Sequence, residues 1–264
     1  MKVSSIQMDC ILGDKEHNVK KALALLDMAC GMGSTLAVLP ELFSTGYRVK
    51  DLDMDLAETI PGETTKKLAN IAQSRGIYVV GALLEHGESR GVIYDTAVLV
   101  SPEGIEGIYR KIFLWDAERV RFKKGDSFPV FKCSFGSLGI QICYEVGFPE
   151  GARILSLKGA DILLYPSAFG AKRYYVWDVA TRSRALENGV FLIASNRSGK
   201  ENDLEFGGHS RIISPTGEIL SEASQNDEVI ISEIDPNMVP RQRREVPYLR
   251  DHEKTILMEA LKNL

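Results

Sequence analysis

The chain of 264 residues contains few cysteines and few histidines, four of each. The cysteines form no CxxC pair and no regular spacing, which argues against a disulfide framework or a thiolate metal site. None of the scattered histidines lies at metal-ligand spacing from another histidine or a cysteine. A GxxxxGK[ST] phosphate loop is also absent. The sequence therefore predicts free thiols in a reducing compartment, with no bound metal and no other cofactor.

Long apolar runs and an excess of basic residues are missing as well. No run approaches the roughly 18 apolar residues of a membrane helix. Residues 1–10 alternate apolar and polar side chains, as a strand does, and do not resemble a signal peptide. The formal net charge of −4 leaves no basic surplus for nucleic acid or for a membrane surface. We therefore expect a cytoplasmic protein that binds neither nucleic acid nor membranes.

The composition is that of an ordinary globular protein, with 44% hydrophobic and 26% charged residues. A chain of this length can form one large domain or two small ones. There is no composition shift, low-complexity stretch or long linker, so we predict a single domain over residues 1–264. Three prolines punctuate its last part, and we interpret residues 236–264 as a C-terminal tail.

Strands alternate with helices along most of the chain. Two pairs of strands flank similar proline–glycine turns at residues 102–104 and 215–217, which is typical of hairpins and hints at an internal duplication. The mixture of hairpins and helix-linked crossovers predicts an α/β protein with mixed sheets, and the number of strands favours two packed sheets. The expected strands are 2–8, 35–40, 77–84, 93–101, 105–111, 138–143, 161–165, 190–196, 210–214, 218–220 and 229–234. The expected helices are 19–29, 61–75, 149–158, 174–187 and 251–261.

Three ionisable side chains come at the ends of predicted strands. Glu41 follows residues 36–40, Lys111 follows residues 105–110, and Cys143 follows residues 139–142. Side chains at neighbouring strand ends in α/β proteins converge on one crevice. We therefore treat Glu41, Lys111 and Cys143 as one candidate active site.

These three residue types suit nucleophilic catalysis. A thiol needs a base or a nearby cation to become the reactive thiolate. Glu41 could take the proton, and Lys111 could stabilise the thiolate and then the oxyanion of a tetrahedral intermediate. A carboxylate base works best near neutral pH if burial raises its pKa. On these residues alone the alternative stays open, because a buried cysteine is more often inert packing.

The sequence around these residues resembles the signature blocks of the nitrilase superfamily of carbon–nitrogen hydrolases. The resemblance covers nearly the whole chain in the expected order. It rests on residues 39–47, 109–111 and 139–150, and continues through 184–188, 195–197 and 208–218.

The resemblance implies a role for each residue. Glu41 would be the general base, Lys111 the oxyanion stabiliser and Cys143 the nucleophile. A second glutamate follows the lysine in this family. Glu118 is the candidate here, with Asp116 and Glu145 as alternatives, although Glu145 better suits a backbone anchor near the cysteine.

The resemblance also implies an architecture. The expected fold is an α-β-β-α four-layer sandwich, in which two mixed sheets lie between helix layers. Such proteins commonly pair through helices, so we expect a homodimer or a higher homo-oligomer. The tail at 236–264 would contribute to those contacts.

Departures from the family pattern narrow the range of reactions that we expect this chain to catalyse. Nitrile-cleaving members have tryptophan after the cysteine and longer chains, whereas this chain has Tyr144. Several carboxylate-recognising branches have arginine three or four residues after the cysteine, where this chain has Val146 and Gly147. Residues 165–169 and 177–184 nevertheless resemble the ω-amidase-like branch. Lys172 or Arg173 could supply a substitute cation, unless both are surface charges.

We therefore predict an amidohydrolase that releases ammonia and a carboxylic acid from a small amide through a cysteine thioester. N-carbamoyl (ureido) hydrolysis is the main alternative. A nitrilase, a subunit that passes ammonia to a partner and an inactive scaffold are weaker ones. The candidate walls of the substrate pocket are aromatic: Phe43, Trp115, Tyr144, Phe169 and Trp177.

Overall fold

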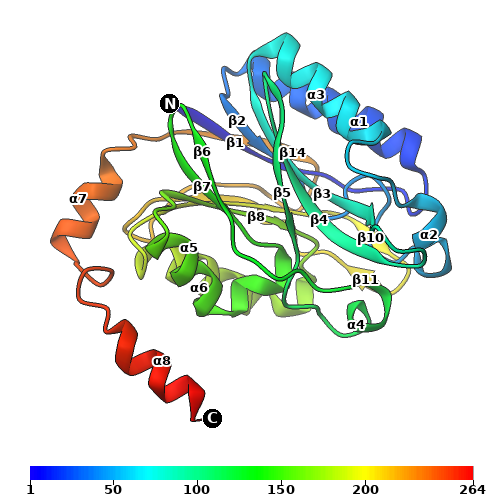
Figure 1. The fold of residues 1–264 in the computed structure, drawn as a ribbon. Coiled ribbons are helices and arrows are strands. Elements are labelled where there is room, and N and C mark those ends of the chain that lie inside the picture. Colours follow the sequence, from blue (N-terminus) through cyan, green and yellow to red (C-terminus); the bar gives the residue numbers. More distant parts are fainter. Residues whose placement is uncertain (264) are drawn as a thin grey trace.

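The computed structural model describes residues 1–263, and its two six-stranded sheets lie face to face between layers of helices (Figure 1). The first sheet has the order β14-β1-β2-β3-β4-β5, with β14 (Glu228–Glu233), β1 (Lys2–Gln7), β2 (Leu36–Val38), β3 (Tyr78–His86), β4 (Ile93–Ser101) and β5 (Gly104–Arg110). The second has the order β13-β12-β9-β8-β7-β6, with β13 (Ile219–Glu222), β12 (Arg211–Ile213), β9 (Phe191–Asn196), β8 (Ile162–Ser167), β7 (Gly136–Ile140) and β6 (Val130–Cys133). This arrangement confirms the predicted α-β-β-α fold.

The two sheets repeat one pattern of strand directions. Strands β1, β2 and β3 are parallel, as are β7, β8 and β9. An antiparallel strand follows on one side of each trio, and an antiparallel hairpin on the other. The hairpins are β4–β5 and β12–β13, which are the two predicted from proline–glycine turns. Their equivalent places support the internal duplication suggested by the sequence.

Helices cover the outer face of each sheet. Helices α1 (Lys15–Gly31) and α3 (Glu63–Arg75) pack on the first sheet, and α5 (Pro149–Leu157) and α6 (Tyr174–Leu186) pack on the second. Pro149 lies in the first turn of α5, where its missing N–H costs no helical hydrogen bond. The remaining short elements are η1 (Lys50–Leu52), α2 (Asp53–Leu56), α4 (Glu118–Arg121), η2 (Cys143–Gly147), η3 (Ala171–Arg173), β10 (Lys200–Glu201) and β11 (Leu204–Glu205).

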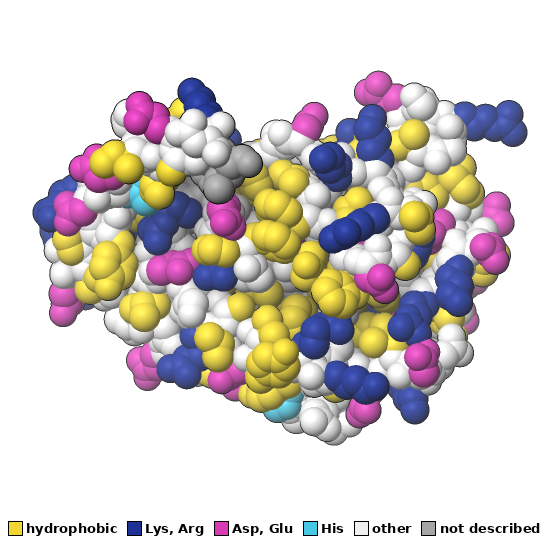
Figure 2. Space-filling model, turned by 90° about the horizontal axis from the view of Figure 1, so that it is seen from below, with side chains coloured by type: hydrophobic (Ala, Val, Ile, Leu, Met, Phe, Trp, Pro, Cys, Tyr) yellow, Lys and Arg dark blue, Asp and Glu magenta, His cyan; other side chains and the backbone are white. Residues whose placement is uncertain are grey.

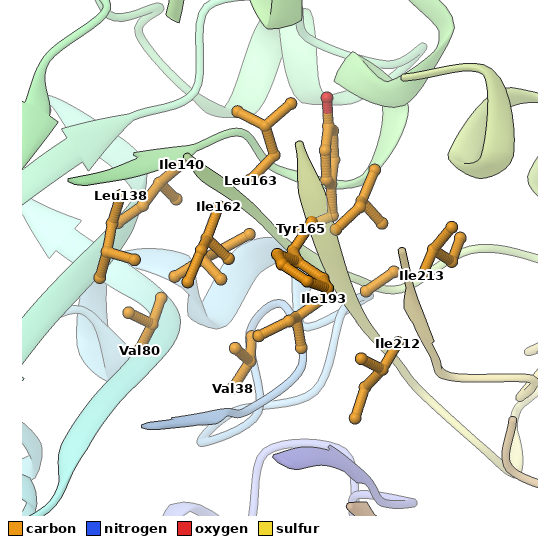
Figure 3. Close-up of a cluster of buried hydrophobic side chains, with 14 of the residues drawn as sticks. Val38, Val80, Leu138, Ile140, Ile162, Leu163, Tyr165, Ile193, Ile212 and Ile213 are labelled. Atoms are coloured by element: carbon orange, nitrogen blue, oxygen red, sulfur yellow. The ribbon is translucent and has the colours of Figure 1, made fainter. Parts of the chain in front are cut away.

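The main core lies between the two sheets and continues beneath α5 and α6. Apolar side chains from both sheets meet there, among them Val38 and Val80 from the first and Ile140, Ile162 and Ile193 from the second (Figure 3). A separate apolar cluster joins the first sheet to α1 and α3. Strands β8 and β9 are buried along their whole length, as parallel strands covered on both faces are. The strand ends that carry the site therefore project from a rigid platform.

The end of the chain is more regular than its prolines suggested. Part of the interpreted tail is helix α7 (Met238–Glu245), which buries Val239 and donates from Arg243 to the Ala160 carbonyl oxygen at 2.7 Å. The predicted last helix is α8 (Lys254–Lys262), and Figure 1 shows it standing away from the two sheets. No helix in residues 1–263 has the length and apolar character needed to cross a membrane. A role for residues 236–264 in oligomer contacts stays a prediction.

Candidate active site

The three predicted catalytic side chains meet at one edge of the sandwich. Glu41 comes three residues after β2, and Lys111 directly follows β5. Strands β2 and β5 run in the same direction, so their carboxyl ends share an edge of the first sheet. Cys143 comes three residues after β7 in the facing sheet. Glu41 and Lys111 are fully buried, and Cys143 is 6% exposed.

Cys143 lies on a turn of unusual backbone geometry. Strand β7 ends at Ile140, earlier than predicted, and Cys143 opens the 3-10 helix η2 with a φ angle of +50°. A non-glycine residue in this left-handed region costs about 1–3 kcal/mol, which the surrounding structure must offset. Glu145 supplies part of that support, because its carboxylate accepts hydrogen bonds from the Ile142 N–H at 2.6 Å and the Ile112 N–H at 2.9 Å. Glu145 thus ties the cysteine turn to the segment that follows Lys111.

The Lys111 ammonium is the centre of the charged cluster. Its Nζ lies 2.5 Å from Glu41 Oε1, 2.8 Å from Glu118 Oε1 and 3.4 Å from Asp95 Oδ2. Burial lowers the pKa of Lys111, but the three carboxyl groups outweigh burial and hold it well above the ordinary value. Oxygen atoms of the same three carboxyl groups lie within 4.8 Å of one another, a spacing that could suit a metal ion. Here the ammonium already supplies the positive charge between them.

Glu41 is held by donors on both oxygens. Oε1 accepts from Lys111, and Oε2 accepts from the Ala168 N–H at 2.8 Å. Burial raises the pKa of the Glu41 carboxyl, but the Lys111 charge and hydrogen bonds outweigh burial and bring the pKa below its ordinary value. Burial therefore does not set the pKa of this group. At neutral pH Glu41 is a carboxylate ready to accept a proton.

The pKa of the Cys143 thiol is shifted in the opposite direction. The Glu41 carboxylate is one of the charged groups that act on this thiol. Burial and the charge of Glu41 raise the pKa of the Cys143 thiol well above its ordinary value, and Lys111 only partly offsets them. The resting site therefore pairs a neutral thiol with an adjacent carboxylate, so that the proton must move when the sulfur attacks.

The second acidic residue that was predicted to join the cluster is Glu118 and not Asp116. Glu118 Oε1 accepts from Lys111 at 2.8 Å and from the Tyr47 hydroxyl at 2.6 Å, and Oε2 accepts from the Trp115 N–H at 2.8 Å. Asp116 is exposed at the rim of the cavity. Glu118 is therefore positioned to fix the Lys111 ammonium and the wall around it.

Two residues of the site were not found from the sequence. Asp95 lies within the buried strand β4, and its only sequence signal is a carboxylate in a mostly apolar run. Tyr47 lies in the loop after Glu41. Glu201 anchors this loop by accepting hydrogen bonds from the Tyr47 and Arg48 N–H groups, each at 2.9 Å. No local spacing relates Glu201 to that loop.

A cavity of about 470 Å³ opens beside Cys143 and Glu118. Three of the five predicted aromatic walls line it: Trp115, Tyr144 and Phe169. The prediction is not met for the other two. Phe43 packs in the apolar cluster beneath α1 and α3, and Trp177 packs in the main core, where its Nε1 donates to the His209 carbonyl oxygen at 2.9 Å.

Three arginines line the cavity, and only one of them lacks a carboxylate partner among the described residues. Arg121 forms a two-point pair with Asp53, and Arg48 pairs with Asp203. The Arg173 guanidinium instead lies over the Trp115 ring, with its carbon 4.5 Å from the ring centre, and 5.4 Å from the centre of a second ring. Lys50 lies at the exposed rim, and Lys172 is not part of the lining. Of the two cations proposed from the sequence, the structure brings Arg173 to the cavity.

The fold and the order of the matching sequence segments are those of a carbon–nitrogen hydrolase. Residues 2–244 match the carbon–nitrogen hydrolase family model, so the chain belongs to this family, and it is an enzyme of the nitrilase superfamily. It is 39% identical over 251 residues to a nitrilase of Pyrococcus abyssi, covering 92% of this chain and 93% of the relative. It is 31% identical over 261 residues to the human omega-amidase, covering 94% of each chain.

Solved structures of the superfamily share the whole fold. A carbon–nitrogen hydrolase from Helicobacter pylori superimposes with a TM-score of 0.92 and 30% identity, covering 99% of this chain and 98% of that one. An amidase from Nesterenkonia sp. superimposes with a TM-score of 0.88 and 26% identity, covering 98% and 95%. A mutant of the amidase from Nesterenkonia sp. AN1 carries the acetamide moiety of fluoroacetamide bound covalently to its active-site cysteine.

Proposed function

We propose that this enzyme hydrolyses the primary amide of a small carboxylate-bearing substrate, with Cys143 as the nucleophile. The observation that carries the proposal is a buried cluster beside a cavity, in which Cys143 lines the cavity, Lys111 holds Glu41 at 2.5 Å and both charges act on the Cys143 thiol. A nucleophile, a base and a fixed cation next to a cavity are the parts that acyl transfer requires.

The first half of the reaction forms a thioester. Glu41 takes the thiol proton as the Cys143 sulfur attacks the amide carbon, which gives a tetrahedral intermediate with a negative oxygen. The Lys111 ammonium stabilises that oxygen. The protonated Glu41 then gives its proton to the departing nitrogen, so that ammonia leaves and the acyl group stays on sulfur.

The second half returns the enzyme to its resting state. A water molecule takes the place of ammonia, and Glu41 accepts a proton from it while the oxygen attacks the thioester carbon. Collapse of the second tetrahedral intermediate breaks the carbon–sulfur bond and releases the carboxylic acid. The sulfur recovers a proton from Glu41, so protons balance over the cycle without a metal ion or an organic cofactor.

The preference for a carboxylate-bearing amide rests on Arg173. Its guanidinium lies over the Trp115 ring, which restricts its motion and leaves its N–H donors for a ligand. Arginine binds carboxylates through paired, charge-assisted hydrogen bonds. Val146 and Gly147 cannot provide such a clamp, because they carry no cation. Arg173 thus replaces the expected arginine from a different segment.

Replacing Arg173 by methionine tests recognition of the substrate carboxylate separately from hydrolysis of the amide. The monoamide of a four-carbon dicarboxylic acid and its neutral analogue butyramide share the reacting amide and differ in the carboxylate. Arg173→Met should lower kcat/KM for the charged amide about 10- to 100-fold, the effect of one charge-assisted contact. It should leave butyramide hydrolysis nearly unchanged.

The matched control for that experiment is Lys172→Met, which removes a neighbouring cation outside the cavity lining. Measured ammonia release should be the same for Lys172→Met and the wild type with both amides. Equal losses for charged and neutral amides in Arg173→Met would remove Arg173 from carboxylate recognition.

N-carbamoyl hydrolysis is the second candidate, since Arg173 could hold the carboxylate of an N-carbamoyl amino acid equally well. That reaction releases carbon dioxide together with ammonia, whereas amide hydrolysis releases ammonia without carbon dioxide. Measuring both products from one substrate panel that includes nitriles therefore assigns the reaction.

We also propose that the enzyme is a homo-oligomer. Apolar side chains gather on the face seen from below in Figure 2. Among the large apolar residues of α5 and α6, Tyr175 is 70% and Val179 is 64% exposed. Light scattering after size exclusion should give at least twice the 29.3 kDa chain mass. A mass equal to one chain across micromolar concentrations would contradict the proposal.

A further inference from the structure

Asp95 is a buried carboxyl group that the mechanism above does not use. It lies within strand β4, is 1% exposed, and neither of its side-chain oxygens has a hydrogen-bond partner in the described part of the chain. The nearest cation is Lys111, whose Nζ is 3.4 Å from Asp95 Oδ2 and is engaged more closely by Glu41 and Glu118. A buried carboxylate without a donor is strongly unfavourable, so this arrangement needs an explanation.

The neighbour of Asp95 is the base itself. A carboxyl oxygen of Asp95 lies within 4.8 Å of a carboxyl oxygen of Glu41, and both groups are buried. Two buried carboxyl groups this close can hydrogen-bond to each other only if one of them carries a proton. Glu41 already accepts from Lys111 and from the Ala168 N–H, which favours its charged form, whereas Asp95 has no donor. The proton therefore belongs on Asp95.

We propose that Asp95 is a protonated carboxylic acid that donates a hydrogen bond to Glu41 and so positions this base against the Cys143 thiol. Asp95 is a positioning residue, since it does not line the cavity and acts through Glu41. The proposal rests on the proposed function in one respect, which is that Glu41 acts as the base.

The charges around Asp95 favour this assignment. The groups that face it are Glu41, Lys111 and Glu118, with the Cys143 thiol beyond Glu41. A neutral Asp95 leaves one ammonium against two carboxylates, whereas an ionised Asp95 would add a third negative charge in a dry site. Burial and the Glu41 carboxylate both raise the pKa of Asp95 well above its ordinary value.

The hydrogen bond has a consequence for the pH profile. A donor to the charged form of Glu41 stabilises that form and lowers the pKa of this carboxyl. The acid limb of kcat/KM reports the pKa of the base in the free enzyme. Loss of the donor should therefore move the acid limb to higher pH, whereas loss of a nearby negative charge would move it to lower pH.

Infrared spectroscopy tests the protonation state without any substrate. The difference spectrum between the wild type and Asp95→Asn at neutral pH should contain the carbonyl band of one protonated carboxylic acid. The signals of all other carboxyl groups contribute equally to both spectra and cancel. A difference spectrum with only carboxylate bands would overturn the proposal, even if the enzyme proves inactive on amides.

Two substitutions test the positioning role. Asparagine is neutral and donates through its amide, so Asp95→Asn should keep kcat within about threefold of wild type with the acid limb in place. Leucine has approximately the shape of aspartate but carries no hydrogen-bond donor. Asp95→Leu should therefore lower kcat about 10- to 100-fold at nearly constant KM and move the acid limb of kcat/KM to higher pH.

The proposal fails if Asp95→Asn loses as much turnover as Asp95→Leu, or if its acid limb moves to lower pH. It also fails if Asp95→Leu behaves as the wild type. Circular dichroism shows whether the leucine variant folds, and if it does not, Asp95→Asn and the infrared spectrum decide. An inactive wild type with the protonated-acid band present would count against the proposed function alone.

Discussion

Cys143→Ala should abolish ammonia release, with a loss in kcat of at least about 10⁴-fold, as expected when the nucleophile of a covalent mechanism is removed. No other side chain can take its place. Glu41 is held by Lys111 and the Ala168 N–H, and the described structure shows no second thiol lining the cavity. Substrate binding should be retained, because the walls of the cavity and Arg173 are unchanged. Stopped assays of ammonia at saturating amide measure the loss.

The matched control for this prediction is Cys133→Ala. Cys133 is a half-buried free thiol on the edge strand β6, outside the lining of the cavity. Its replacement should leave turnover within about twofold, as for most substitutions away from a site. Comparable activity of Cys143→Ala and the wild type would remove the thioester mechanism altogether.

Lys111→Met should lower kcat about 10²- to 10³-fold, because the oxyanion loses its fixed donor. Methionine keeps much of the aliphatic stem in place and removes the charge. Without the ammonium, burial raises the pKa of the Glu41 carboxyl, so the acid limb of kcat/KM should also move to higher pH. The pH profile thus distinguishes the loss of a charge from a general disturbance of the site.

The same substitution should destabilise the protein by about 3–5 kcal/mol at neutral pH, because it leaves buried carboxylates without their cation. Their folded-state pKa values then exceed the unfolded ones, so the folded state binds more protons. The free energy of unfolding should therefore rise as pH falls, and thermal unfolding should show the deficit shrinking from pH 8 to pH 5.5.

Lys132→Met is the matched control for both effects. Lys132 is exposed on strand β6, so its replacement should change neither kcat nor the pH dependence of unfolding. Normal turnover in Lys111→Met would exclude Lys111 from the site. A loss of stability equal at pH 8 and pH 5.5 would contradict the assignment of Lys111 as the counter-ion of the carboxylates.

Much of the fold follows from local patterns along the chain. The apolar runs of β8 and β9, the proline in the first turn of α5 and the proline–glycine turns of two hairpins each specify their element without distant contacts. The number of strands favoured two packed sheets. Strand order depends on contacts between residues far apart, so the four-layer arrangement of sheets and helices was inferred from the resemblance. The structure confirms both.

The three ionisable strand ends were predictable, but the supporting residues were not. Phe43 and Glu41 would lie on the same side of an extended chain. Leu42 between them has a φ angle of +49°, and this turn sends the phenyl ring into the core and not into the cavity. Such a conformation of a leucine depends on its surroundings and leaves no mark in the sequence.

Asp95 escaped prediction for a related reason. Its partner Glu41 is 54 positions away along the chain, and nothing in the local pattern pairs them. The resemblance identifies groups that touch the substrate, whereas groups that set the charge of those residues become visible only in the packed site.

The central claim is that the acyl group is carried on the Cys143 sulfur. The most direct measurement is rapid acid quenching of the enzyme during turnover of a small amide, followed by intact mass and peptide mapping. We predict a mass increase equal to the acyl group on the peptide that contains Cys143, absent in Cys143→Ala. Sustained ammonia release by an enzyme that never gains this mass, or gains it on another residue, would contradict the account.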